Sequence, residues 1–370
     1  MIRAKPIQRL LDGGRRRLGA ALAWRPPKQA RRAIDDAARD RNARIAAGGA
    51  VAGAGVLAAA AEAIRRRRRG RSRAYRLRSW ETAADGIRRI ALGRADDALE
   101  QLRDGVERDF PAAIHEARKD LKKLRSVLRL VRKELGDELY RRENNRFRDT
   151  GRMLSGARDA EVKLGAVRDL CERFPERLSA ERLAPLIGAL EGERDRHVEA
   201  NRSGGAVAVA IREIEAGRAV IEAWPLEADG WKLIEPGLRR QYRRGRKRFA
   251  AARDEPTNET IHEWRKRVKD LWYHLRILRD VDRDTLAPAI DDSHRLSELL
   301  GDHHDLAVMR QDALGRREPL AAGELDRLLA AITERQRQLL AEAMPLGERI
   351  YAEKPKALSK RVRRRWNARR

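Results

Sequence analysis

Residues 114–133 read IHEARKDLKKLRSVLRLVRK, and residues 261–280 read IHEWRKRVKDLWYHLRILRD. The second stretch repeats the first 147 residues further along the chain. The identical pairs include Ile114/Ile261, His115/His262, Glu116/Glu263, Arg118/Arg265, Lys119/Lys266, Lys122/Lys269, Arg129/Arg276 and Arg132/Arg279. Internal self-similarity of this kind indicates a duplicated structural unit. We therefore predict two related halves, each with one copy of this stretch.

Each copy has the periodicity of an amphipathic helix with one cationic face. At about 100° per residue, one set of polar residues in the first copy, without an acid among them, shares a stripe about 120° wide. That stripe holds His115, Arg118, Lys119, Lys122, Arg125, Ser126, Arg129 and Lys133. The opposite side holds Leu121, Leu124, Leu128 and Val131. The second copy aligns His262, Arg265, Lys266, Lys269, Tyr273 and Arg276, with Trp272 in place of Arg125 and Asp280 in place of Lys133.

A stripe of one charge sign is unfavourable for an isolated helix. Like charges three and four residues apart repel each other, and ordinary solvated faces mix signs. Two stripes at the same phase favour a polyanion that relieves the repulsion. Arginine offers two parallel hydrogen bonds to phosphate oxygens, lysine a point charge, and histidine a further donor. The alternative is a solvated face whose histidine is a buried cap.

A second, weaker match follows each copy. MLSGARDAEV, from Met153, pairs with LLGDHHDLAV, from Leu299, and keeps an aspartate and a valine in place. Prolines mark several helix boundaries, and no stretch alternates like a strand. We predict an all-α fold with two pseudo-repeated helical-bundle halves, at about 81–215 and 216–355.

A third basic stretch lies at the start of the second half. Residues 238–249 read LRRQYRRGRKRF, and Arg239, Arg243 and Arg246 share one helix face. Anion binding and simple solvation are both open for this face. Arg88 and Arg89 form a weaker counterpart in the first half.

The two ends of the chain differ from its centre. Residues 1–80 form a basic N-terminal region with an Ala/Gly-rich segment at 45–61, followed by arginines at 65–69. That segment is short and weakly apolar for a membrane span of roughly 20 residues, so a packed helix and a membrane or granule-surface contact through 45–69 both stay open. The basic tail, 356–370, is expected to be solvated and partly disordered.

The amino-acid composition restricts the class of ligand. Lys and Arg total 84 against 57 Asp and Glu, a formal net charge of +27. Such an excess predicts an anionic partner. Aromatic residues make up only 4%, which disfavours a site that stacks nucleic-acid bases. Cys171 is the single cysteine, which excludes an internal disulfide or a cysteine-based zinc site.

At these residues the chain resembles the CHAD family, the conserved histidine α-helical domains. The resemblance covers roughly residues 82–355 and rests on AIHEARKDLKKLR, SGARDAEV, YRRGRKRF, TIHEWRKRVKDLWYHL and LGDHHDLAVM. It implies two four-helix halves related by a pseudo-twofold axis around a basic cavity, and binding of inorganic polyphosphate at cytoplasmic polyphosphate granules. It also implies that His115, Arg118, Lys119, Lys122 and Arg129 line one wall and His262, Arg265, Lys266, Lys269 and Arg276 the other.

Two other functions remain as alternatives. Asp302-His303-His304-Asp305 resembles an HD-type metal phosphohydrolase motif, with His274, His294 and Asp312 as further ligands. The matching first-half residues, Ala157-Arg158-Asp159, lack both histidines, so we expect no metal, no cofactor and no catalysis. Nucleic acid is the second alternative, and we expect it to bind only weakly or at low salt.

Overall fold

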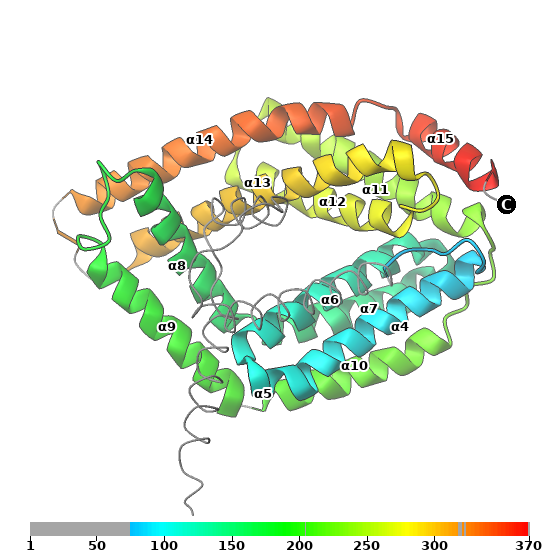
Figure 1. The fold of residues 1–370 in the computed structure, drawn as a ribbon, viewed down its shortest axis with the longest axis horizontal. Coiled ribbons are helices and arrows are strands. Elements are labelled where there is room, and N and C mark those ends of the chain that lie inside the picture. The colour runs from blue at the N-terminus through cyan, green and yellow to red at the C-terminus, as the bar shows by residue number, and fades with distance from the viewer. Residues whose placement is uncertain (1–74, 204, 317–319, 322, 369–370) are drawn as a thin grey trace, which may run out of the picture.

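The computed structural model describes residues 75–203, 205–316, 320–321 and 323–368. Over these residues the protein consists of helices and connecting turns without a strand, which confirms the all-α prediction (Figure 1). The helices are α4 (Ala83–Glu100), α5 (Val106–Arg108), α6 (Phe110–Leu130), α7 (Arg132–Met153), α8 (Gly156–Arg173), α9 (Ala184–Ser203), α10 (Ala206–Glu222), α11 (Trp231–Asp254), α12 (Asn258–Ile277), α13 (Arg283–Gly315), α14 (Glu324–Ile350) and α15 (Pro355–Ala368), with a π-helical turn at Gln101–Gly105.

Side-chain caps begin the helices that carry the repeat. The Asp109 carboxylate accepts from the Ala112 amide before α6, and Pro111 occupies the first turn, where its missing N–H costs nothing. Thr257 and Thr260 cap α12 reciprocally. Local hydrogen bonds thus start both helices, at positions that differ by one residue in the repeat.

The first half is a bundle of α4, α6, α7 and α10, which contact one another around a core of leucine, isoleucine and alanine. Its predicted apolar face is confirmed: Leu121, Leu124, Leu128 and Val131 are all buried. α8 and α9 pair at the end of this bundle, at the left of Figure 1.

The second half contains α11, α12, α13 and α14, and its last two helices are long. α13 packs against α12, α14 and α8. Where α8 meets α13, Lys163 lies 2.6 Å from Glu193 and 2.7 Å from Asp312, which joins the halves. The boundary expected at 215/216 falls inside α10, and the break is the loop at 223–230, where helix periodicity stops.

The two copies of the repeat lie against each other. His274 on α12 donates from Nε2 to the carbonyl oxygen of Ser126 on α6, at 2.8 Å. Both residues are fully buried. In the repeat, Ser126 corresponds to Tyr273, so α6 and α12 meet near corresponding points. This contact brings the two cationic stripes to one region of the molecule.

A close approach between α11 and α6 supports this arrangement. A Cβ atom on Gly237 would lie 1.8 Å from the carbonyl oxygen of Leu130. No side chain fits there, so glycine lets α11 press on the end of α6. Arg240, one turn along α11, donates to the carbonyl of Arg129 at 2.6 Å.

Both helix ends and the tail differ from expectation. α6 stops at Leu130 and α12 at Ile277, so Lys133 and Asp280 lie beyond the stripes to which we assigned them. Residues 356–368 are not a solvated tail, because they belong to α15, which buries Leu358, Val362 and Trp366. An apolar residue every three to four positions anchors this helix despite its charge.

The Ala/Gly-rich segment at 45–61 lies outside the described residues. Among the helices that the structure describes, none has the length and apolar character needed to cross a bilayer.

Candidate anion-binding pocket

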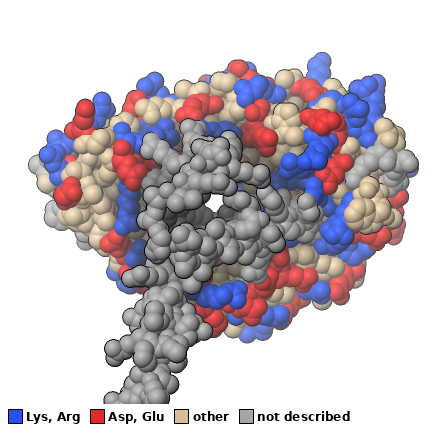
Figure 2. Space-filling view, in the orientation of Figure 1, with Lys and Arg blue, Asp and Glu red and all other residues tan. Residues whose placement is uncertain are grey.

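A pocket of about 440 Å³ opens where α6, α7 and α12 meet. Of the residues that the structure describes, ten lysines and arginines line it, together with a single carboxylate, Asp270. The cationic residues are Arg118, Lys122, Arg125, Arg129, Arg148, Arg152, Arg265, Lys266, Arg267 and Lys269. In Figure 2, Lys and Arg side chains gather to the right of the centre, between α6 and α7 below and α11 and α12 above.

The one carboxylate in the pocket holds the two stripes together. Asp270 accepts from Arg129 on α6 at 3.0 Å and from Arg267 on α12 at 3.3 Å. Acids outside the lining pair with some of these cations, as Glu263 does with Lys266 and Asp149 with Arg148, but the lining itself keeps a large excess of positive charge.

On the α6 side, the arginines already have protein acceptors. Arg118 donates to the carbonyl of Ser155 at 3.2 Å, and Asp159 lies 3.9 Å away. Arg125 donates to the side-chain oxygen of Asn144 at 3.2 Å. Burial and the neighbouring Arg129 lower the pKa of Arg125 to about 10, which still leaves it charged at neutral pH.

On the α12 side, Lys266 pairs with Glu263 and Arg267 with Asp270, but Arg265 and Lys269 are less well compensated. The Nε of Arg265 is buried and has no hydrogen-bond partner among the described residues. Burial, together with Arg265, Lys122 and Lys119, lowers the pKa of Lys269 to about 7, and Asp305 opposes this only partly. A bound anion would supply what both side chains lack: an acceptor for Arg265 and a counter-charge for Lys269.

The histidines flank the pocket rather than line it. His262 stacks on His304 with ring centroids 4.1 Å apart. Burial, with Lys266 and Arg265, lowers the pKa of His262, and burial with His262 and Arg265 lowers that of His304 to about 4. His115 is half-buried on α6, outside the pocket lining.

Of the residues singled out in the sequence, the pocket collects Arg118, Lys122, Arg125, Arg129, Arg265, Lys266 and Lys269. Lys119 lies outside the lining and pairs with Glu116 at 2.7 Å. Arg276 also lies outside it, because its guanidinium stacks 5.0 Å from the Trp272 ring centroid and 5.4 Å from that of Tyr75. Arg239, Arg243 and Arg246 are exposed on α11, away from the lining.

Three cationic lining residues were not predicted from the sequence, and neither was the carboxylate Asp270. Arg148 and Arg152 are four residues apart on α7, and Arg267 lies beside the α12 stripe. Their spacing alone resembles an ordinary charged surface, and Arg148 has Asp149 beside it at 2.8 Å. Only the packing of α7 beside α6 turns these two arginines into a third wall.

The residues of the HD-type alternative do not converge. His274 contacts Ser126, His294 stacks on Trp272 at 4.6 Å, and Asp312 accepts from Lys163. His303 is buried, and desolvation lowers its pKa to about 4. Within the described part of the chain, no three His, Cys, Asp or Glu side chains form a group that could hold a metal ion.

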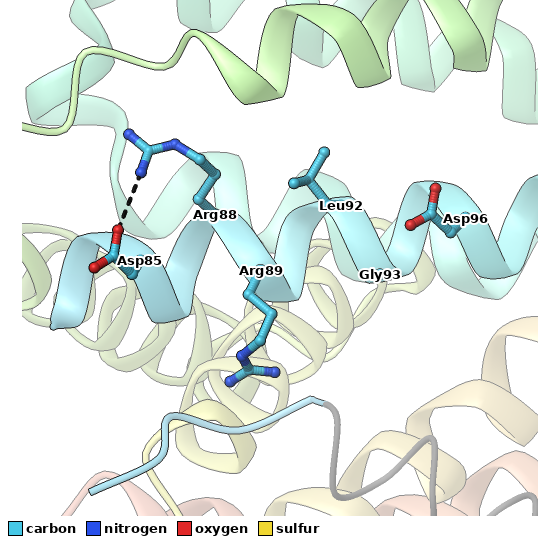
Figure 3. Close-up of a pocket in the computed structure, with 6 residues that line it drawn as sticks. All are labelled: Asp85, Arg88, Arg89, Leu92, Gly93 and Asp96. Atoms are coloured by element: carbon cyan, nitrogen blue, oxygen red, sulfur yellow. Dashed lines mark hydrogen bonds and ion pairs between the residues drawn. The ribbon is translucent and has the colours of Figure 1, made fainter. Parts of the chain in front are cut away.

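A second pocket, of about 400 Å³, lies along α4 (Figure 3). Arg88 and Arg89 point to opposite sides of the helix there. Arg88 pairs with Asp85 at 3.4 Å, and Arg89 pairs with Glu81 at 2.6 Å. With Asp96 also in the lining, this pocket mixes charges and lacks the excess of the first.

These features define a class: an all-helical protein in which two repeated helices build one strongly basic pocket. The family model of the CHAD domain matches residues 90–314, and the chain belongs to the CHAD domain family. A crystal structure of the CHAD domain from the plant Ricinus communis is similar at a TM-score of 0.50 and 17% identity, covering 79% of this chain and 94% of that one. At this identity the likeness shows a shared fold. No curated protein matches the chain.

Proposed function

We propose that this protein binds inorganic polyphosphate in the pocket between α6, α7 and α12. The observation that carries the proposal is the lining: ten cationic side chains from three helices against one carboxylate. A linear anion with one charge per repeating unit can pair with such a row of cations, while each arginine grips phosphate oxygens with two N–H groups.

Polyphosphate fits the lining better than nucleic acid does. The aromatic rings in the lining are those of Phe147 and Tyr273, and both are almost fully buried, at 1% and 3% exposure. They offer little surface on which bases could stack. A ligand that presents only phosphates needs no such surface. Nucleic acid then binds through its backbone alone, weakly and mainly at low salt.

The protein acts by binding and not by catalysis in this proposal. Polyphosphate would need no chemistry at the pocket, because lysine and arginine hold it by charge. Binding would attach the protein to cytoplasmic polyphosphate granules. Incubation with polyphosphate should leave its length distribution on a gel unchanged, and released orthophosphate would show hydrolysis instead.

The test removes four pocket cations at once, two from α6 and two from α12. We expect R118Q/K122Q/R265Q/K269Q to lose at least 100-fold in polyphosphate affinity at physiological salt, since charged hydrogen bonds contribute about 1.5–3 kcal/mol each. Calorimetric titration with polyphosphate of defined length measures the loss, and circular dichroism should show unchanged helicity.

A matched control removes as many charges from the outside of the molecule. R108Q/R177Q/R196Q/R212Q changes exposed residues on or near α5, α8, α9 and α10. Its affinity should stay within a few-fold of the parent protein. Equal losses in both variants would mean that net charge alone drives binding. Displacement of polyphosphate by duplex DNA at equal phosphate concentration would favour the nucleic-acid alternative.

A further inference from the structure

A second basic surface lies outside the pocket, on α11 and α15. α11 has no acidic residue between Glu235 and Asp254, and α15 has none at all. The exposed cations on these two helices are Lys232, Arg239, Arg243, Arg244, Arg246, Lys247, Arg248, Arg253, Lys356, Lys360, Arg363, Arg364 and Arg365. Such a one-signed surface repels itself unless an anion covers it.

The contacts of α15 fix which of its sides borders α11. The ring centroids of Trp366 and Trp231 are 5.9 Å apart, and the Ser359 hydroxyl donates to the Glu235 carboxylate at 2.9 Å. Because the later residue of α15 meets the earlier residue of α11, the two helices run antiparallel. Arg365, on one flank of α15, lies 3.8 Å from Asp282 at the start of α13. Lys356, Lys360 and Arg363 recur at helical spacing on the other flank, which borders the solvent side of α11.

The solvent side of α11 carries its own row. Arg239, Arg243 and Arg246 recur at helical spacing and are exposed. Within the described part of the chain, Arg243 and Arg246 have no carboxylate within 4 Å, and Arg239 has only Glu235, at 3.8 Å. The rows on α11 and α15 therefore form one continuous cationic face.

This face joins the pocket across α11. Arg244 lies near enough to Arg267 in the pocket wall, and to Arg240, for its positive charge to contribute to lowering the pKa of both. Around the helix from Arg244 come Lys247, then Arg243, then the row beside α15. A path across one helix and onto the next is about 20 Å, two helix diameters.

No apolar group accompanies these cations. Trp366 is buried, and the large exposed hydrophobic residues of the described chain are Trp80, Met153 and Leu314, none on α11 or α15. The face thus lacks the apolar side chains that insert a helix into a membrane and the aromatic rings that stack bases. It suits a ligand made of phosphates alone.

We propose that α11 and α15 form an outer binding surface for the part of a long polyphosphate chain that extends beyond the pocket. This inference rests on the proposed function. Of the two helices, α11 lies within residues 90–314, which the family model matches, and α15 lies outside them.

The experiment compares a short polyphosphate that the pocket alone can hold with one long enough to span a further 20 Å or so. The outer variant is R243Q/K360Q/R363Q, and its matched control is R108Q/R196Q/R212Q. The outer variant should bind the short chain like the parent. For the long chain, its slope of log K against log salt should become shallower by about 2, at roughly 0.7 per lost phosphate contact.

The outcomes separate the two proposals. If R265Q/K269Q leaves the affinity for both chain lengths unchanged, the pocket proposal fails. If the pocket variant weakens both chains while the outer variant matches its control on the long chain, only the outer surface is refuted. If the outer variant loses duplex DNA binding but keeps the long chain, the surface serves nucleic acid and the inference is wrong.

Discussion

α6 and α12 carry nearly the same cationic residues but hold them in different surroundings. On α6, Arg118 donates to the Ser155 carbonyl and lies near Asp159. On α12, the Nε of the matching Arg265 is buried without an acceptor in the part of the chain that the structure describes. Lys269 on α12 has a pKa of about 7, because burial and three neighbouring cations disfavour its charge. A duplicated sequence therefore does not produce two equivalent walls.

The difference suggests a division of work between the helices. Cations with protein acceptors are held in place before the ligand arrives, but they gain less from a phosphate that must share or replace those acceptors. Cations without acceptors cost stability in the free protein and gain most on binding. α6 would position the chain, and α12 would supply most of the affinity.

The largest expected effect comes from the matched arginines. R265Q should weaken polyphosphate binding by about 1.5–3 kcal/mol, the range for a charged hydrogen bond, and R118Q by clearly less, because Arg118 shares its donors with Ser155. Calorimetric titration of both variants under one salt condition measures the difference. Equal losses would show that the two walls contribute alike.

A smaller effect is expected at the point where the helices meet. Val127 is the counterpart of His274 in the repeat, so H274V makes the two positions alike. It should destabilise the protein by about 1–2 kcal/mol, since the buried Ser126 carbonyl loses its donor. Urea unfolding at pH 7 measures this, and an unchanged midpoint would contradict the importance of the bond.

The same variant should alter the response to acid. Burial lowers the pKa of His274 from 6.5 to about 4, so the folded protein keeps it neutral. Between these values the unfolded chain binds more protons, and stability falls as pH drops from 6.5 towards 4. H274V should show a shallower fall. His303 and His304, with pKa values also lowered to about 4, would account for acid sensitivity that remains.

The smallest effect concerns proton uptake by Lys269. With a pKa of about 7, this lysine is half-charged in the free protein at neutral pH, and a bound phosphate favours its charged form. Affinity should fall about fivefold between pH 7 and 8, as the charged fraction falls. K269M should lose this dependence, whereas R118Q should bind more weakly but keep it. Isothermal titration at both pH values tests this with a long chain, whose internal phosphates stay charged.

K269M should also change the stability of the protein in the absence of ligand. In the unfolded chain Lys269 keeps its ordinary pKa of 10.5, whereas in the folded protein its pKa is lowered to about 7. Between these values the unfolded chain binds more protons, so the folded protein becomes less stable as the pH falls from 10.5 towards 7. Replacing it with an apolar side chain of similar length should raise the unfolding midpoint at pH 7. A lowered midpoint would mean that the ammonium group is compensated in the free protein.

Much of this protein follows from local sequence alone. The period of leucines in residues 114–133 and 261–280 determines the two amphipathic helices, and the cations on their other side include seven of the pocket's lining residues. Helical periodicity is a property of neighbouring residues, so one sequence reveals it. The repeat predicted two related halves, and the resemblance to the CHAD family implied that both helices line a common site.

Other features depend on residues far apart in the chain. Gly237 has no side chain, so α11 can pack closely against the end of α6. The hydrogen bond from His274 to Ser126 joins α12 to α6, and α7 contributes Arg148 and Arg152 to the pocket. Packing also decided that Arg276 stacks on aromatic rings and that α15 docks on α11. Desolvation and the distance between charges are set by the neighbours that folding brings together, so only the tertiary structure distinguishes Lys269 from an ordinary surface lysine.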